Sequence, residues 1–340
     1  MKKKLILGLL FIVITAGCTQ CSGTEEVTYE KKLARSGGVS YDEKYITIGF
    51  IQTGKESDWR DANTRDYQNT FTKEKGYNLI YIDGNSDARR QVKAMHDLIS
   101  QGVDYIILDP IVEDGWDDIL KLAQDSKISV LLADRGVSAD PSLYTCWIGS
   151  DFKTEGVNAV KWLADYLEKQ GRKSEDINLV ILEGTKGASA TIGRTEGLRK
   201  EISRHKNWHI LASECGNFTQ GEGKAVMEQI LEKHKDIDVL ISENDNMMFG
   251  AMKAMTQKDV SYGVDGDVIT ISFDALGEAF ERMMTGELMV SVECNPLIAG
   301  LCEKVIRQIE AGHEVAPVQY VQESVFTYKN AGEYSKDRKY

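Results

Sequence analysis

The chain has 340 residues and a net charge of −12 at pH 7, from 41 lysines and arginines against 53 aspartates and glutamates. This acidic balance leaves no broad basic face, so charge alone argues against nucleic-acid binding. A chain of this length exceeds what a single hydrophobic core usually organises, and we expect two lobes.

The N-terminus has the features of an export signal. Three lysines precede an apolar run that ends near Ala16 and is too short to span a bilayer. Ala16-Gly17-Cys18 resembles a bacterial lipobox, although Thr15 stands where leucine is usual. We therefore predict a lipoprotein signal peptide over 1–17, lipidation of Cys18, and an extracytoplasmic protein in the periplasm or at the cell surface. An ordinary secretory signal cleaved elsewhere is the alternative.

Residues 18–44 are polar, contain several glycines and mixed charges, and lack sustained periodicity. We expect them to form a flexible tether between the lipid and the folded body. Four further cysteines are far apart, lack the spacing of a zinc site, and are expected to be small buried side chains whose pairing stays open. These are Cys146, Cys215, Cys294 and Cys302. No metal and no cofactor is predicted.

From Lys44 onward, apolar runs of strand length alternate with amphipathic helical stretches. The predicted strands are 46–52, 77–83, 103–109 and 128–134. The predicted helices are about 58–75, a segment around 92–99 closed by Gly102, and about 115–126. Alternation of this kind favours a parallel sheet with helices on both faces.

The same alternation then starts again, which indicates a second lobe of similar build. Strands are predicted at 177–183, 209–213, 237–242 and 268–273, and helices at about 153–170, 193–205, 219–235 and 246–258. The tail adds strands at 288–293 and 319–328 and a helix near 297–311. Because the tail must join lobes already built, we expect the chain to cross between them more than once. The predicted fold class is α/β, with two doubly wound parallel-sheet lobes joined by a hinge.

In open α/β sheets, ligands bind at the carboxyl ends of the strands, and polar residues follow several predicted strands here. Arg135 and Arg194 present forked donors that suit adjacent hydroxyls, and Asp134, Asn244 and Asp274 offer matching acceptors. The alternative is structural: Asp134-Arg135 and Asp274 are loop residues that cap the next helix.

Trp59 and Arg60 follow a polar loop at the start of a predicted helix. The indole suits stacking on the apolar face of a sugar ring while Arg60 reaches its hydroxyls, but packing of Trp59 against the sheet is the simpler interpretation. Trp116 has the same ambiguity, with core packing favoured. The chain lacks a nucleophile elbow and metalloprotease motifs, so no catalytic residue and no enzyme activity is predicted.

Several strand-end segments together resemble sugar-binding proteins of ABC importers that have the type I periplasmic-binding fold. The likeness is greatest to galactofuranose-binding members, with ribose-binding members more distant, and runs in order from about Lys44 to Tyr328. The segments are GFIQTGKESDWR, PIVEDGW, LLADR, EGTKGASATIGR, ENDNMMFGAM, SFDALGEAFERMMTGE and SVECNPLIAG.

The resemblance implies which side chains hold the sugar. They are Glu56, Ser57, Asp58, Trp59, Arg60, Asp134, Arg135, Arg194, Asn244 and Asp274, with Phe218 as a second apolar wall. Two positions depart from the galactofuranose pattern, since Asp58 replaces a glycine and Glu243 replaces a histidine. A carboxylate of Asp58 near the pocket would call for a different donor on the sugar.

The resemblance also implies lobes of 45–149 plus 295–322 and of 150–294 plus 323–340. By this resemblance, the protein would be a lipid-anchored, monomeric solute-binding protein. It would capture a monosaccharide, galactofuranose-like or another pentose or hexose, and deliver it to an ABC permease with a separate ATPase subunit. The lipid would be its only contact with the membrane.

Three alternatives stay open. In the first alternative, the protein is a sugar sensor that uses the same pocket and signals to a histidine kinase or chemoreceptor. A transcription regulator with this effector fold would need a helix-turn-helix ahead of the first strand, where the chain has a lipobox. A sugar hydrolase would use paired carboxylates such as Asp134 and Asp274.

Overall fold

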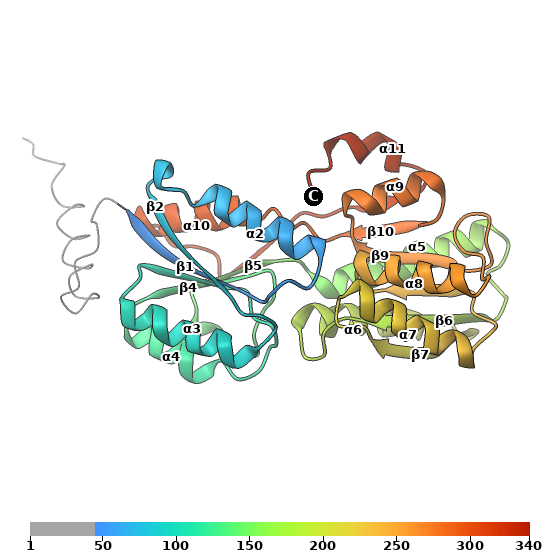
Figure 1. The fold of residues 1–340 in the computed structure, drawn as a ribbon, viewed down its shortest axis with the longest axis horizontal. Coiled ribbons are helices and arrows are strands. Elements are labelled where there is room, and N and C mark those ends of the chain that lie inside the picture. The colour runs from blue at the N-terminus through green and yellow to red at the C-terminus, as the bar shows by residue number, and fades with distance from the viewer. Residues whose placement is uncertain (1–44) are drawn as a thin grey trace, which may run out of the picture.

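The computed structural model describes residues 45–340, which form two α/β lobes side by side (Figure 1). The predicted signal peptide, the tether and the lipidation site at Cys18 lie outside the described residues. Within the described part, no helix combines the length and apolar character needed to cross a membrane. The predicted fold class is confirmed, since each lobe is a doubly wound sheet covered by helices on both faces.

The first lobe contains a six-stranded parallel sheet in the order β11-β5-β4-β3-β1-β2. Its strands are β1 (Ile46–Gln52), β2 (Tyr77–Asp83), β3 (Tyr105–Leu108), β4 (Ser129–Ala133), β5 (Cys146–Gly149) and β11 (Val318–Tyr320). Its helices are α2 (Asp58–Thr70), α3 (Ala88–Gln101), α4 (Asp117–Asp125) and α10 (Ala299–Glu310). Helices α2 and α10 cover one face, and α3 and α4 cover the other.

The strand β3 shows why such runs are continuously apolar. Tyr105 and Ile107 pack under α2 and α10, whereas Ile106 and Leu108 pack against α3 and α4. Successive side chains of a strand point to opposite faces, so a strand covered on both sides needs apolar residues at every position.

The second lobe repeats this plan with the strand order β12-β10-β9-β8-β6-β7, in which only β12 is antiparallel. Its strands are β6 (Ile177–Glu183), β7 (Trp208–Cys215), β8 (Val239–Ser242), β9 (Ile269–Asp274), β10 (Val290–Glu293) and β12 (Val325–Thr327). Its helices are α5 (Phe152–Lys169), α6 (Ser189–Ile202), α7 (Gln220–Lys233), α8 (Asp245–Gln257), α9 (Gly277–Thr285) and α11 (Ala331–Tyr334). Helices α5 and α6 cover one face, and α7, α8 and α9 cover the other.

The chain passes between the lobes three times. The first passage joins β5 to α5, the second joins β10 to α10, and the third joins β11 to β12. The predicted single strand 319–328 is therefore wrong, because residues 321–324 leave one sheet before β12 joins the other. The sequence also failed to predict β5, a strand of only four residues. The predicted helix 58–75 ends at Thr70, before a separate 3-10 turn at Lys73–Lys75, and α6 begins at Ser189 instead of 193.

Candidate functional site: a polar pocket between the lobes

A pocket lies between the lobes, next to the carboxyl ends of strands from both sheets. It is lined by Glu56, Ser57, Trp59, Arg60, Asp134, Arg135, Phe152, Ala190, Arg194, Phe218, Asn244, Asp274 and Cys294. All the sequence-predicted site residues except Asp58 are among them. The topology brings together side chains that are more than 200 residues apart in the chain, because strand ends of both lobes face the same gap.

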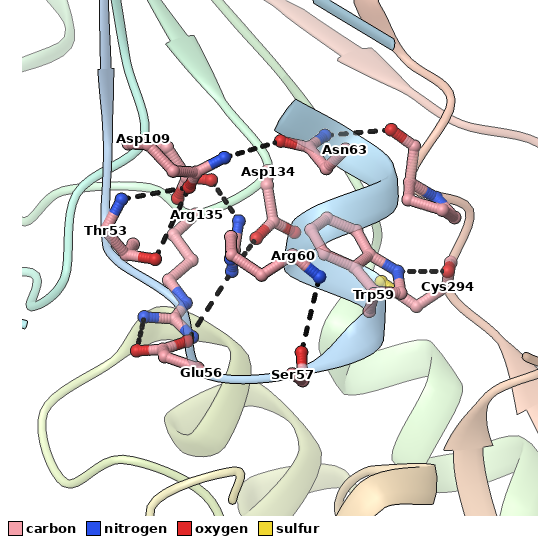
Figure 2. Close-up of polar contacts among 12 residues, drawn as sticks. Thr53, Glu56, Ser57, Trp59, Arg60, Asn63, Asp109, Asp134, Arg135 and Cys294 are labelled. Carbon is pink, nitrogen blue, oxygen red and sulfur yellow. Dashed lines mark hydrogen bonds and ion pairs between the residues drawn. The ribbon is translucent and has the colours of Figure 1, made fainter. Parts of the chain in front are cut away.

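The start of α2 places two of these side chains. Ser57 has an extended backbone and its hydroxyl accepts a hydrogen bond from the backbone N–H of Arg60 at 3.3 Å, so it caps the helix (Figure 2). Trp59 and Arg60 then lie in the first turn, next to the pocket. The polar loop before the helix is therefore a capping segment as well as a supplier of pocket residues.

Arg60 is buried among three carboxylates of the first lobe. It is ion-paired to Asp109, its Nη2 lies 2.9 Å from Asp134 Oδ2, and Glu56 Oε2 is 3.8 Å away (Figure 2). Burial opposes the charge, but the three carboxylates hold the pKa of Arg60 above its ordinary value. Asp109 was not predicted as a site residue. It follows β3 directly, so its position at a strand end was the signal.

Arg135 spans the gap between the lobes. Its Nη2 and Nη1 lie 2.6 and 3.3 Å from the two oxygens of Glu56, which gives a forked ion pair with both side chains buried. Its guanidinium also lies 5.1 Å from the ring centre of Phe218, which belongs to the second lobe. The guanidinium of Arg135 is thus held by a carboxylate on one side and an aromatic ring on the other.

Arg194 is the buried cation of the second lobe's side of the pocket. Its Nε donates to Glu155 at 2.7 Å, its Nη1 donates to the backbone carbonyl of Glu243 at 2.5 Å, and its Nη2 is 3.7 Å from Asp274. Close packing of α5 against α6 brings Glu155 and Arg194 together. A Cβ added at Gly156 of α5 would lie 2.4 Å from the backbone oxygen of Arg194 on α6. Glu243 itself does not line the pocket, and its backbone carbonyl holds Arg194 from behind.

Asn244 is a helix cap, while the two strand-end aspartates are not. Its Oδ1 accepts from Met247 N at 2.9 Å at the start of α8, and its Nδ2 donates to the carbonyl of Phe218 at 2.9 Å. Asp134 and Asp274 cap no helix, so the structural alternative fails for them.

Asp134, Asp274 and Phe218 have φ values of 56°, 104° and 60°. A left-handed backbone costs a non-glycine residue about 1–3 kcal/mol, and such strain clusters at ligand sites.

The two tryptophans that the sequence left ambiguous have different roles. Trp59 comes from the first lobe, yet it packs with Phe152 and Phe218 of the second lobe, and its Nε1 donates to Cys294 O at 2.6 Å (Figure 2). It is therefore both a packing residue and a pocket wall. Trp116 is buried in the core of the first lobe, where its Nε1 donates to Val112 O at 2.7 Å. It does not line the pocket.

Asp58 is the one predicted residue that the structure places elsewhere. Its side chain is exposed and accepts a hydrogen bond from Asn246 of the second lobe, so it adds no charge to the pocket lining. Phe152, Ala190 and Cys294 are lining residues that the sequence did not reveal. Phe152 follows the unrecognised strand β5, Cys294 was expected only as a small buried side chain, and the residue type of Ala190 carried no signal. All four cysteines of the described part are unpaired, and Cys215 is only half-buried.

The pocket is nearly filled by its own side chains. It encloses about 20 Å³, which is room for roughly one water molecule. Its lining joins three buried guanidinium groups, several carboxylates and the rings of Trp59, Phe152 and Phe218. Paired donors and acceptors beside flat apolar rings suit a ligand that has many hydroxyls and an apolar face.

Comparison with known proteins agrees with this geometry. Residues 48–300 match the family model of the periplasmic binding protein domain. The chain belongs to this family. It is 36% identical over 257 residues to the galactofuranose-binding protein YtfQ of Escherichia coli (strain K12), covering 75% of this chain and 79% of the relative. The family resemblance inferred from the strand-end motifs is therefore confirmed.

Two solved structures share the fold. The crystal structure of a galactofuranose-binding protein has a TM-score of 0.81 at 31% identity, covering 86% of this chain and 98% of that protein. A Mycobacterium smegmatis protein in complex with β-D-fucofuranose has a TM-score of 0.80 at 35% identity, with coverages of 85% and 93%. Both named ligands are five-membered-ring sugars.

Proposed function

We propose that this periplasmic binding protein captures a neutral monosaccharide in its furanose form, galactofuranose or a close analogue, and releases it unchanged to an ABC permease. The observation that carries the proposal is the convergence of Arg60, Arg135 and Arg194 from two lobes on one pocket walled by aromatic rings. The furanose ring is favoured because the relatives that share the fold at 31–36% identity are named for such sugars.

Hydroxyl groups match this lining chemically. Each sugar hydroxyl both donates and accepts, so it can accept from a guanidinium and donate to a neighbouring carboxylate such as Asp134 or Asp274. Each hydrogen bond to a charged group contributes about 1.5–3 kcal/mol net, so a few suffice for micromolar binding after ordering costs. Trp59 and Phe218 would cover the C–H faces of the ring.

The sugar would couple to a movement of the lobes. A pocket of about 20 Å³ does not admit a monosaccharide, so entry requires the lobes to separate or Glu56 to leave Arg135. A ligand that touches both lobes favours the state in which they are together, by as much as its affinity differs between the two states. A permease would recognise that state, and its separate ATPase subunit would supply the energy.

The arrangement at the membrane follows from the same proposal. The mature protein would be an extracytoplasmic monomer held by lipid on Cys18, with 18–44 as its tether. Its lobes would be 45–149 plus 295–322 and 150–294 plus 323–340, which is the division that the two sheets support. Neither Asp134 nor Asp274 is a free carboxylate, because each is paired with a buried arginine, and this disfavours a hydrolase.

A thermal-shift screen tests the proposal. Galactofuranose, arabinofuranose and fucofuranose are compared with ribose, galactopyranose and glucose, and a ligand at 100 times its Kd should stabilise the fold by about 2.7 kcal/mol. Mass spectrometry of the sugar after incubation should return it unchanged. Stabilisation by none of these sugars, or hydrolysis of any of them, would contradict the proposal.

A further inference from the structure

A small polar cluster lies where the three passages between the lobes meet. Ser150 belongs to the first passage, Cys294 and Asn295 to the second, and Glu323 to the third. The hydroxyl of Ser150 and the backbone N–H of Asn295 both donate to Glu323 Oε1, at 2.7 and 2.8 Å. Ser150 Oγ also lies 3.4 Å from Cys294 Sγ. One carboxyl group thus ties together all three passages.

A second carboxyl group faces this one. Glu155 of α5 is buried, and a carboxylate oxygen of Glu155 lies within 4.8 Å of one of Glu323, close enough for the two charges to act on each other. Its Oε2 accepts from Arg194 Nε at 2.7 Å, but its Oε1 is fully buried and receives no bond from an N–H or hydroxyl donor. Two carboxylates in contact repel each other, and a hydrogen bond between them needs one proton. The unpartnered oxygen of Glu155 is where that proton would be received.

The charges around the pair decide which carboxyl holds the proton. Arg194 is the cation that acts on Glu323, and it is already bonded to Glu155 and close to Asp274. The other groups that face the pair are Cys294, whose pKa is raised well above its ordinary value by burial, and the carboxylate of Asp134. Glu155 is therefore bonded directly to the guanidinium, whereas no hydrogen bond joins Glu323 to a cation.

We propose that Glu323 is a positioning residue whose carboxyl group is protonated and donates a hydrogen bond to Glu155. Glu323 thereby orients Arg194 in the pocket through Glu155, and it also joins the three passages. The part of this inference that concerns the sugar rests on the proposed function; the protonation itself does not. Withdrawal from water, followed by the charge of Glu155, raises the pKa of Glu323 to about 9. The stabilisation from this raised pKa is complete below the ordinary glutamate pKa of 4.5 and is lost progressively as the pH rises to about 9.

Glu323→Gln is the decisive variant, because its amide copies a protonated carboxyl group. The amide oxygen can accept from Ser150 and Asn295, and the NH₂ group can donate to Glu155. We expect its melting temperature to equal that of the parent at pH 4, below the ordinary pKa of a glutamate, and to exceed it at higher pH. Between pH 7 and 10 the parent should lose about 2–4 °C more than the variant, since one titrating group has been removed. Glu333→Gln, on the exposed surface of α11, is the control and should follow the parent.

Sugar binding gives a second measurement. With galactofuranose as the probe, the Kd should rise between pH 7 and 10 at least threefold more in the parent than in Glu323→Gln, whose remaining pH dependence comes from groups such as Glu243. If the protein binds no sugar, the proposed function fails but the melting comparison still decides the protonation. Coinciding melting profiles of parent and Glu323→Gln, or a Glu323→Gln protein that does not fold, would overturn the inference. Loss of stability in a chelator that zinc restores would also overturn it, because Glu155, Cys294 and Glu323 would then hold a metal ion.

Discussion

Asn246 of α8 and Asp58 of α2 bind each other between the lobes. Asn246 Nδ2 donates to Asp58 Oδ2 at 2.7 Å, and the backbone N–H of Asp58 donates to Asn246 Oδ1 at 3.3 Å. The first N–H groups of a helix have no partner within the helix. Here the amide of Asn246 supplies one for α2 from the opposite lobe. Neither residue lines the pocket, so we expect the pair to act on the lobes and not on the ligand.

Asn246→Ala is expected to weaken sugar binding about fivefold, chiefly through faster release. The variant loses a partly exposed hydrogen bond to a carboxylate, worth about 1 kcal/mol, only in the state with the lobes together. Stopped-flow fluorescence measures the release rate. Asn69→Ala changes an exposed asparagine near the far end of α2 and is the matched control. Equal release rates in both variants would show that the Asp58–Asn246 pair does not restrain the lobes.

Arg135→Ala is expected to weaken sugar binding at least tenfold, because a buried hydroxyl and Glu56 both lose their charged partner. Arg135→Lys should also bind more weakly than the parent, since an ammonium group cannot reproduce the fork. Isothermal calorimetry measures both. Arg89→Ala, which removes an arginine side chain that is 94% exposed on α3, is the control. Unchanged affinity in Arg135→Ala would remove this residue from the site.

Asp109→Ala is expected to destabilise the fold by about 3–5 kcal/mol, because Arg60 would remain charged and buried with one carboxylate fewer. Urea unfolding measures the free energy. Asp97→Ala is the matched surface control: it breaks an ion pair to Lys93 whose side chains are 74% and 51% exposed, and should cost less than about 1 kcal/mol. Similar losses in the two variants would mean that the Asp109–Arg60 pair contributes little.

Trp59→Phe and Trp116→Phe separate a pocket wall from a core residue. Each keeps an aromatic ring but loses an indole hydrogen bond, to Cys294 O or to Val112 O respectively. Trp59→Phe should lower sugar affinity several-fold. Trp116→Phe should lower the unfolding free energy by about 1 kcal/mol and leave the affinity as it is. A loss of affinity in Trp116→Phe would contradict the assignment of this residue to the core.

The sequence predicted the fold well where strands are long or fully buried. The run that forms β3 is apolar at every position because helices cover both faces, and this signal does not depend on distant residues. It failed at β5 and at 319–328. In the latter stretch, β-forming residues stand on both sides of Gln322, Glu323 and Ser324, and only the pairing with two different sheets shows that the strand is broken.

The candidate site was predictable because strand ends of a doubly wound sheet share one edge. Residue type and position were therefore enough for Asp134, Arg135 and Asp274. They were not enough for Asp58, since the direction of a side chain in the first helical turn depends on the opposite lobe. The partners of each arginine depend on contacts between separate segments, such as Arg60 with Asp134 or Arg135 with Glu56, and Glu155 meets Glu323 from a different passage between the lobes.

Glu56, which is ion-paired to Arg135, competes with a bound sugar for the same guanidinium. A sugar that takes the Nη donors already bonded to Glu56 must displace this carboxylate, so the affinity gained there is the difference between two interactions. Each 1.4 kcal/mol of that internal interaction raises the Kd tenfold. A sugar that bonds these donors more weakly than Glu56 does would therefore bind poorly.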